Sequence, residues 1–151
     1  MQIVASSPRI GNTGAQNTYP DGLRSLVDWV SATFSAQTPP EMVCEKIGLP
    51  YGLFVQMDRG AFGYRKQLRF GHISLYYDGN PGMGVHLEMT GQGCREFETL
   101  SEVGWDYLFE LILQNGHFTR LDVAVDDFNG YFTVGQVIDH VRKGLCVSRF
   151  K

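Results

Sequence analysis

Residues 53–77 read LFVQMDRGAFGYRKQLRFGHISLYY, and this stretch decides the fold class. Apolar and aromatic residues recur through it, while Gly60, Gly63 and Gly71 interrupt it at short intervals. This pattern predicts short strands joined by tight turns. The centre of the chain is therefore expected to form a hairpin or a meander of antiparallel strands.

Strand and helix patterns extend outward from this centre in both directions. We expect strands over residues 26–34, 83–90 and 117–125, a further strand that begins near residue 146, and helices over residues 39–46, 99–115 and 133–143. This order indicates an α+β domain in which helices pack on one face of a largely antiparallel sheet. Residues 1–22 are rich in Ser, Gly, Asn and Thr and are expected to be a flexible tail, which leaves residues 23–151 for the domain.

Two short motifs precede the long helix. Thr99-Leu-Ser-Glu102 has the form of a capping box, which predicts that this helix begins at Thr99. Gly91-Gln-Gly-Cys-Arg95 predicts a loop in which the glycines let a phosphate approach the backbone and Arg95 adds positive charge. This loop is not a P-loop, because the G-x-x-x-x-G-K-[ST] pattern is absent.

Composition limits the class of protein. No apolar run approaches the roughly 20 residues that cross a bilayer, so no membrane partner is expected. Three widely spaced cysteines suit free thiols in a reducing compartment, and we expect a cytoplasmic location. The net charge of −3 argues mildly against nucleic acid. Its distribution reverses that argument, because residues 59–77 contain four Lys or Arg and no Asp or Glu.

The segment Phe62–Phe70 interleaves aromatic and basic side chains. Single-stranded nucleic acid is commonly held by such a mixture, through base stacking and phosphate neutralisation. The residues that we expect to contact DNA are Tyr64, Arg65, Lys66, Arg69 and Phe70, together with Arg95 and Arg120. A solvated hairpin with half-buried aromatic side chains would show the same pattern.

The strand at residues 85–90 places an imidazole and a carboxylate on one face. His86 and Glu88 alternate with apolar residues, so both point away from the expected core. Their spacing suits two ligands of one divalent ion. The solvated face of an ordinary amphipathic strand would show the same residue pattern. The H-x-E pattern alone is therefore a weak signal.

A second unusual carboxylate lies in the strand at residues 117–125. Leu121, Val123 and Val125 are expected to face the core, while Arg120 and Asp122 share the other face. A mid-strand Asp needs a partner, which is either Arg120 or a cation. If the two strands are neighbours, His86, Glu88 and Asp122 converge, and such ligands favour Mg²⁺ or Mn²⁺ over zinc.

Four segments resemble, in the same order, the replication initiation factor family, which includes plasmid rolling-circle initiators and relaxases of integrative conjugative elements. They are Tyr64-Arg-Lys-Gln-Leu-Arg-Phe-Gly71, His86-Leu-Glu-Met-Thr-Gly-Gln-Gly-Cys-Arg95, His117-Phe-Thr-Arg-Leu-Asp-Val-Ala-Val-Asp-Asp127 and Val147-Ser-Arg-Phe-Lys151. The likeness covers about residues 27–151. It implies an HUH-endonuclease-like fold, binding to origin DNA that is single-stranded or hairpin-shaped, and a metal-dependent nick through a covalent 5′-phosphotyrosine. The paired-histidine motif of HUH enzymes is absent, and His86-Leu-Glu88 looks like its counterpart.

Members of this family carry the nucleophilic tyrosine after a strand that resembles Val147–Lys151. We therefore expect the catalytic tyrosine beyond Lys151 and the chain to be the N-terminal part of an incomplete domain. Tyr76, Tyr77, Tyr107 and Tyr131 carry no motif that places them at the His86, Glu88 and Asp122 cluster. Two alternatives stay open: a DNA-binding module without catalysis, and a generic α+β interaction domain.

Overall fold

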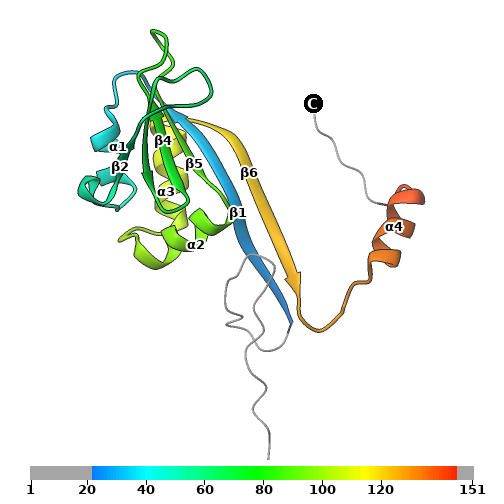
Figure 1. Cartoon of the computed structure of the whole chain (residues 1–151). Coiled ribbons are helices and arrows are strands. Elements are labelled where there is room, and N and C mark those ends of the chain that lie inside the picture. The colour runs from blue at the N-terminus through cyan, green and yellow to red at the C-terminus, as the bar shows by residue number, and fades with distance from the viewer. Residues whose placement is uncertain (1–21, 146–151) are drawn as a thin grey trace, which may run out of the picture.

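Six antiparallel strands form one sheet, and three of the four α-helices pack on one of its faces (Figure 1). The computed structural model describes residues 22–145. The strands are β1 (Leu23–Phe34), β2 (Val55–Met57), β3 (Lys66–Phe70), β4 (Ile73–Tyr77), β5 (Val85–Met89) and β6 (Gly116–Asp127), in the spatial order β2-β3-β4-β5-β1-β6. The helices are α1 (Pro40–Lys46), α2 (Gly91–Leu100), α3 (Trp105–Asn115) and α4 (Val134–Arg142), with a short 3₁₀ turn at Tyr51–Leu53. The expected α+β class and antiparallel sheet are confirmed.

The core lies between the sheet and helices α1, α2 and α3. Alternate residues of the central strands enter it, among them Val30, Leu75 and Leu87, all fully buried. Phe97 of α2 and Leu108 of α3 pack against them from the helix side. Burial of apolar area is the main stabilising contribution here. This face of the sheet is called the helix face below.

The two described cysteines are free thiols within that core. Burial raises the pKa of Cys44 and of Cys94 to about 12, because the thiolate loses its hydration. Both side chains therefore act as small apolar residues, as expected for free thiols. Cys146 lies outside the described residues.

Helix α2 occupies the place where the sequence predicted a glycine-rich loop. Thr90 caps it by accepting a hydrogen bond from the Gly93 amide at 3.4 Å. A Cβ at Gly93 would lie 2.4 Å from the carbonyl oxygen of His72. The glycine therefore allows close packing of the helix on the sheet rather than an approach of phosphate.

The predicted capping box at Thr99 was wrong. Thr99 lies near the end of α2, and its hydroxyl donates to the Arg95 carbonyl at 2.8 Å. Helix α3 starts later, after Gly104, and its buried stripe of Leu108, Leu111 and Ile112 is as expected. The single helix predicted over residues 99–115 is thus the end of one helix, a turn and a second helix.

Strands β1 and β6 form a long antiparallel pair that reaches past the helices (Figure 1). Leu121, Val123 and Val125 of β6 were expected to be buried, but they are exposed, with 42%, 63% and 57% of their surface accessible. The correction has a structural reason: β6 is an edge strand, and no described helix extends over this part of it.

Helix α4 follows β6 and stands apart from the sheet (Figure 1). Thr133 caps it, as expected, and Gln136 completes a capping box. None of its residues is buried. The expected tail and the strand expected near residue 146 lie outside the described residues, apart from residue 22. Within residues 22–145, no helix is both long and apolar enough to cross a bilayer.

Candidate nucleic-acid interface

The face of the sheet opposite the helices carries mainly polar and aromatic side chains, and we call it the open face. The strand pairing arranges them in rows across the sheet. The first row is Gln67, Tyr76, His86, Thr33 and His117; the second is Arg69, Ser74, Glu88, Ser31 and Arg120; Trp29 and Asp122 begin a third. The rows follow from alternation, because residues two apart on a strand share a face.

His86 is the centre of the first row. Its Nδ1 lies 2.9 Å from the hydroxyl oxygen of Thr33 on β1. Three aromatic rings surround the imidazole, with centroid distances of 5.7 Å to Phe62, 6.2 Å to Tyr64 and 6.1 Å to Tyr76. Burial lowers the pKa of His86, and the nearby His117 lowers it further. Both effects favour the neutral form of the imidazole.

Glu88 is the centre of the second row, between two buried serines. Gln67 donates to Ser74 at 3.0 Å, and the Trp29 indole donates to Ser31 at 2.9 Å. Burial raises the pKa of Glu88, while Arg120 opposes the shift. The carboxylate thus lies between arginines at either end of its row, Arg69 and Arg120.

Arg120 and Asp122 form an ion pair at the edge of the open face. The guanidinium donates to both carboxylate oxygens, with Nε 3.1 Å from Oδ1 and Nη2 2.5 Å from Oδ2. Hydrogen bonding from Arg120 lowers the pKa of Asp122. The guanidinium also lies 4.2 Å from the centroid of the Trp29 ring, close enough for a cation–π contact. Of the two partners considered for Asp122, the structure gives it Arg120.

The predicted convergence of His86, Glu88 and Asp122 does not occur. The prediction needed β5 and β6 to be neighbours, but β1 lies between them. Asp122 is aligned with Trp29, whereas Glu88 is aligned with Ser31. Among residues 22–145, no group of three or more His, Cys, Asp or Glu side chains could hold a metal ion.

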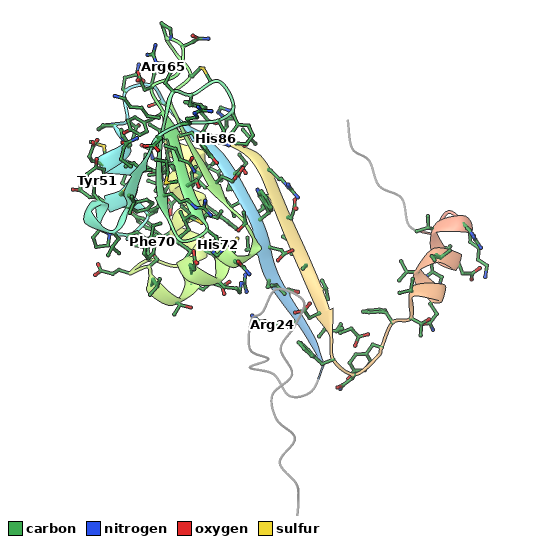
Figure 2. The ribbon with its side chains drawn as sticks, viewed as in Figure 1. Arg24, Tyr51, Arg65, Phe70, His72 and His86 are labelled. Atoms are coloured by element: carbon green, nitrogen blue, oxygen red, sulfur yellow. The ribbon has the colours of Figure 1, made fainter. Side chains whose placement is uncertain are left out.

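The residues of the predicted basic and aromatic segment are divided between different parts of the sheet. Arg69 lies on the open face, and its Nε donates to the Gly71 carbonyl at 2.9 Å. Arg65 and Lys66 approach Asp78, at 2.7 Å and 3.6 Å. Figure 2 shows Arg65 and Phe70 near opposite ends of β3. The alternation of the strand thus separates side chains that are adjacent in sequence.

The two aromatic residues predicted for DNA contact are largely enclosed. Phe70 packs on the helix face, 5.8 Å from the ring of Phe54. Tyr64 is buried and donates its hydroxyl to the Met83 carbonyl at 3.1 Å. Their chief role in the described structure is packing.

Arg95 lies on helix α2, behind the sheet. It donates to the Val27 carbonyl and pairs with Glu98 at 3.0 Å, and only 14% of its side chain is exposed. Arg95 thus joins α2 to β1 and does not reach the open face.

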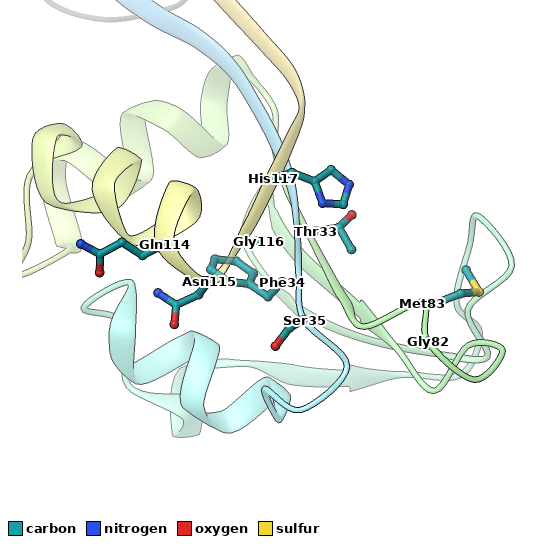
Figure 3. A pocket seen from close by; sticks show the side chains of 9 residues that line it. All are labelled: Thr33, Phe34, Ser35, Gly82, Met83, Gln114, Asn115, Gly116 and His117. Carbon is teal, nitrogen blue, oxygen red and sulfur yellow. The ribbon is translucent and has the colours of Figure 1, made fainter.

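A hollow of about 420 Å³ opens at the end of the first row (Figure 3). Thr33 and His117 line it from the sheet, Met83 from the loop after β4, and Gln114 and Asn115 from the end of α3. The side chains of Thr33 and His117 lie side by side in Figure 3. The hollow therefore extends the open face beyond His86.

Several residues of this face were not named as candidates from the sequence. Trp29, Thr33 and His117 join it because β1 lies between β5 and β6. Their shared face was visible in the alternation of each strand, but the strand order was not. Tyr76 was not expected near the candidate site, yet its ring lies beside His86, and the residue is buried.

Comparison with known proteins identifies the family. Residues 24–114 match the family described as the rolling-circle replication initiation protein N-terminal domain. The chain belongs to this rolling-circle replication initiation family. Residues 116–151 match a second description, replication initiation factor. The resemblance stated from the sequence is confirmed.

Two relatives extend the comparison. NicK of Bacillus subtilis (strain 168), whose name describes a candidate DNA relaxase, is 31% identical over 134 residues, which are 85% of this chain and 38% of NicK. A rolling-circle replication initiator protein from Geobacillus stearothermophilus is 38% identical, with a TM-score of 0.75 over 86% of this chain and 54% of the other. The chain thus spans about half, or less, of the length of these relatives.

Proposed function

We propose that this chain is the DNA-recognition part of a rolling-circle initiator or relaxase, and that its open face binds single-stranded origin DNA. One observation carries the proposal: the face away from the helices is polar and aromatic, and its Glu88 row ends in an arginine on each side. Arg69 and Arg120 are both exposed, so both can reach phosphates. Membership of the initiation family supports DNA as the partner.

The acidic residues of the open face limit where a phosphate can lie. Glu88 repels a phosphate group at the centre of its row, so the backbone is expected to pass near Arg69 and near Arg120. At Arg120 a phosphate competes with Asp122 for the guanidinium. Between the two arginines, the partly exposed rings of Trp29 and His86 offer surfaces to bases, as single-strand binding requires. The division explains how a chain with a net charge of −3 can bind a polyanion.

Initiators and relaxases of this family generally depend on a divalent metal. The described residues do not form a complete site for it, because Asp122 is paired with Arg120 and His86 and Glu88 are not joined by a third His, Cys, Asp or Glu among residues 22–145. We therefore assign no step of recognition to a metal. DNA binding by this chain is expected to be the same in Mg²⁺ and in EDTA.

A second candidate, DNA binding without nicking, is favoured by the environment of Tyr76. Tyr76 is the tyrosine of the first row, but only 7% of its surface is exposed, and burial raises the pKa of its hydroxyl. A phosphodiester attack needs an aligned, accessible hydroxyl. We expect residues 1–151 to form no covalent DNA adduct on a denaturing gel with Mn²⁺. An adduct that is lost in Tyr76→Phe would instead identify Tyr76 as the nucleophile.

The proposal is tested by fluorescence anisotropy with labelled single-stranded and hairpin DNA over a range of salt concentrations. Arg69→Ala and Arg120→Ala should each weaken binding and lower the salt slope by about one unit, as expected for one lost phosphate contact. Lys46→Ala, on α1 at the helix face, is the control with the same change of charge. Binding that is independent of salt, or equal loss in the control, would overturn the assignment of the open face.

A further inference from the structure

The loop between β2 and β3 places an aromatic ring over the open face. The Tyr64 amide donates to the Ala61 carbonyl at 2.9 Å, which closes a four-residue turn around Phe62 and Gly63. The φ angles of these central residues are +56° and +86°. Two positive angles in succession define a type I′ turn, in which Asn or Gly is favoured at the first position.

Phe62 is therefore in a conformation that its side chain disfavours. An aromatic residue at positive φ is an outlier, and such strain persists where the surrounding structure imposes it or where it serves a function. The turn could have used Asn at no cost to its geometry. The presence of Phe at this position points to a role for the ring itself.

The ring is exposed and yet anchored. Phe62 has 64% of its surface accessible, so burial does not explain the aromatic residue. Its ring meets Tyr76 at a centroid distance of 5.2 Å and His86 at 5.7 Å, both edge to face. These contacts restrict the ring before any ligand arrives, and such preorganisation lowers the entropic cost of binding.

The charge of the surroundings indicates the kind of ligand. Among the cations of the loop and β3, Arg65 and Lys66 pair with Asp78. The exposed Arg59 and Arg69 therefore supply the positive charge of this region. One exposed ring is far smaller than the roughly 800 Å² per partner of a stable protein interface. The exposed ring of Phe62 is instead comparable in size to a single base, which would carry its phosphate beside it. The combination of ring and charge favours a nucleotide over an apolar peptide.

We propose that Phe62 is a stacking platform for one unpaired base of DNA that crosses the open face. The inference rests on the proposed function and adds a base contact to the phosphate contacts of Arg69 and Arg120. The base would stack on the exposed surface of the ring, and stacking accepts any base because every base has a π face. Phe62 thus contributes affinity without reading sequence.

A thermodynamic cycle tests the inference with two probes, an oligothymidylate and an oligomer of abasic spacers of the same length. Phe62→Asn removes the ring but suits the turn, so its melting temperature should stay within about 4 °C of the wild type. Binding of the oligothymidylate should weaken about tenfold, the loss expected for one stacked base. Binding of the abasic oligomer, and the salt slope with both probes, should be unchanged.

The conservative variant Phe62→Trp should retain oligothymidylate affinity, which separates stacking from an effect on the loop. Equal affinity of Phe62→Asn and wild type for the oligothymidylate would overturn the inference while Arg69→Ala still supports the proposed function. Equal weakening with both probes would also overturn it, because the lost contact would not involve a base. Absence of salt-dependent binding in the wild type would remove both proposals.

Discussion

Strands β5 and β6 carry the same alternation of apolar and polar residues, yet only β5 buries its apolar face. Val85, Leu87 and Met89 of β5 are at most 4% exposed, whereas Val123 and Val125 of β6 are mostly accessible. β5 lies between β4 and β1 and under helix α2, while β6 pairs with β1 alone among the described strands. Alternation determines which residues share a face, and the neighbouring elements determine whether that face is covered.

The polar faces of the two strands also differ. On β5, His86 and Glu88 are partly buried. Burial lowers the pKa of His86 and raises the pKa of Glu88, which favours the neutral form of each side chain. On β6, Asp122 is paired and its pKa is lowered by Arg120. The carboxylates of similar strands thus have opposite shifts, because one is desolvated and the other is bonded to a cation.

Leu87→Ala and Val123→Ala test the difference in burial most strongly. Leu87→Ala should lower the free energy of unfolding by about 2–5 kcal/mol, because it opens a cavity in the core. Val123→Ala should change it by about 0.5 kcal/mol or less, as for other exposed positions. Urea unfolding followed by circular dichroism measures both. Comparable losses would mean that the apolar face of β6 is covered in solution.

Arg95→Ala sharpens the division between the two faces of the sheet. The variant leaves the Val27 carbonyl and Glu98 without their arginine partner, so it should be destabilised by about 1–3 kcal/mol. Its DNA affinity, measured where it is fully folded, should equal that of the wild type. A lower salt slope in Arg95→Ala would return Arg95 to the DNA-contacting residues.

His86 provides the smallest effect, through the pH dependence of stability. Its folded pKa lies below the ordinary value of 6.5, so the unfolded chain binds this proton first as the pH falls. The neutral His86 therefore contributes to the free energy of unfolding above about pH 6.5, and this contribution is lost as the pH falls toward the folded pKa. His86→Asn should therefore lose less stability than the wild type over this range.

The titration of His86 itself can be followed by NMR. Its ring signals should titrate below pH 6.5 in the folded protein. Glu88 has the opposite sign, because its raised pKa destabilises the fold as the pH rises through that value. Glu88→Gln removes this contribution and is the control. A His86 pKa above 6.5 would contradict the enclosed, neutral imidazole.

Local patterns in the sequence predicted most elements of the fold. β-branched alternation located β1, β5 and β6, and the Thr133 cap located α4. Helix α2 was missed because Gly91 and Gly93 are poor helix formers. Gly93 is tolerated because the helix packs too close to the His72 carbonyl for a Cβ. Such tertiary contacts leave no local signal.

The candidate site was predicted only in part. His86, Glu88 and Arg120 were found from alternation, and all three lie on the open face. Asp122 was joined to the wrong partners because the sequence does not state that β1 separates β5 from β6. The strain at Phe62 was equally invisible, since it depends on the turn that the Ala61–Tyr64 hydrogen bond closes.

Photocrosslinking tests the central claim, that DNA lies on the open face, most directly. An oligothymidylate that contains 5-iododeoxyuridine is bound to the chain, irradiated and digested, and the modified peptides are located by mass spectrometry. We expect crosslinks at Trp29, Phe62 or His117, whereas the exposed Tyr107 of α3 serves as the internal control on the helix face. Crosslinks confined to Tyr107 and its helix would contradict the account.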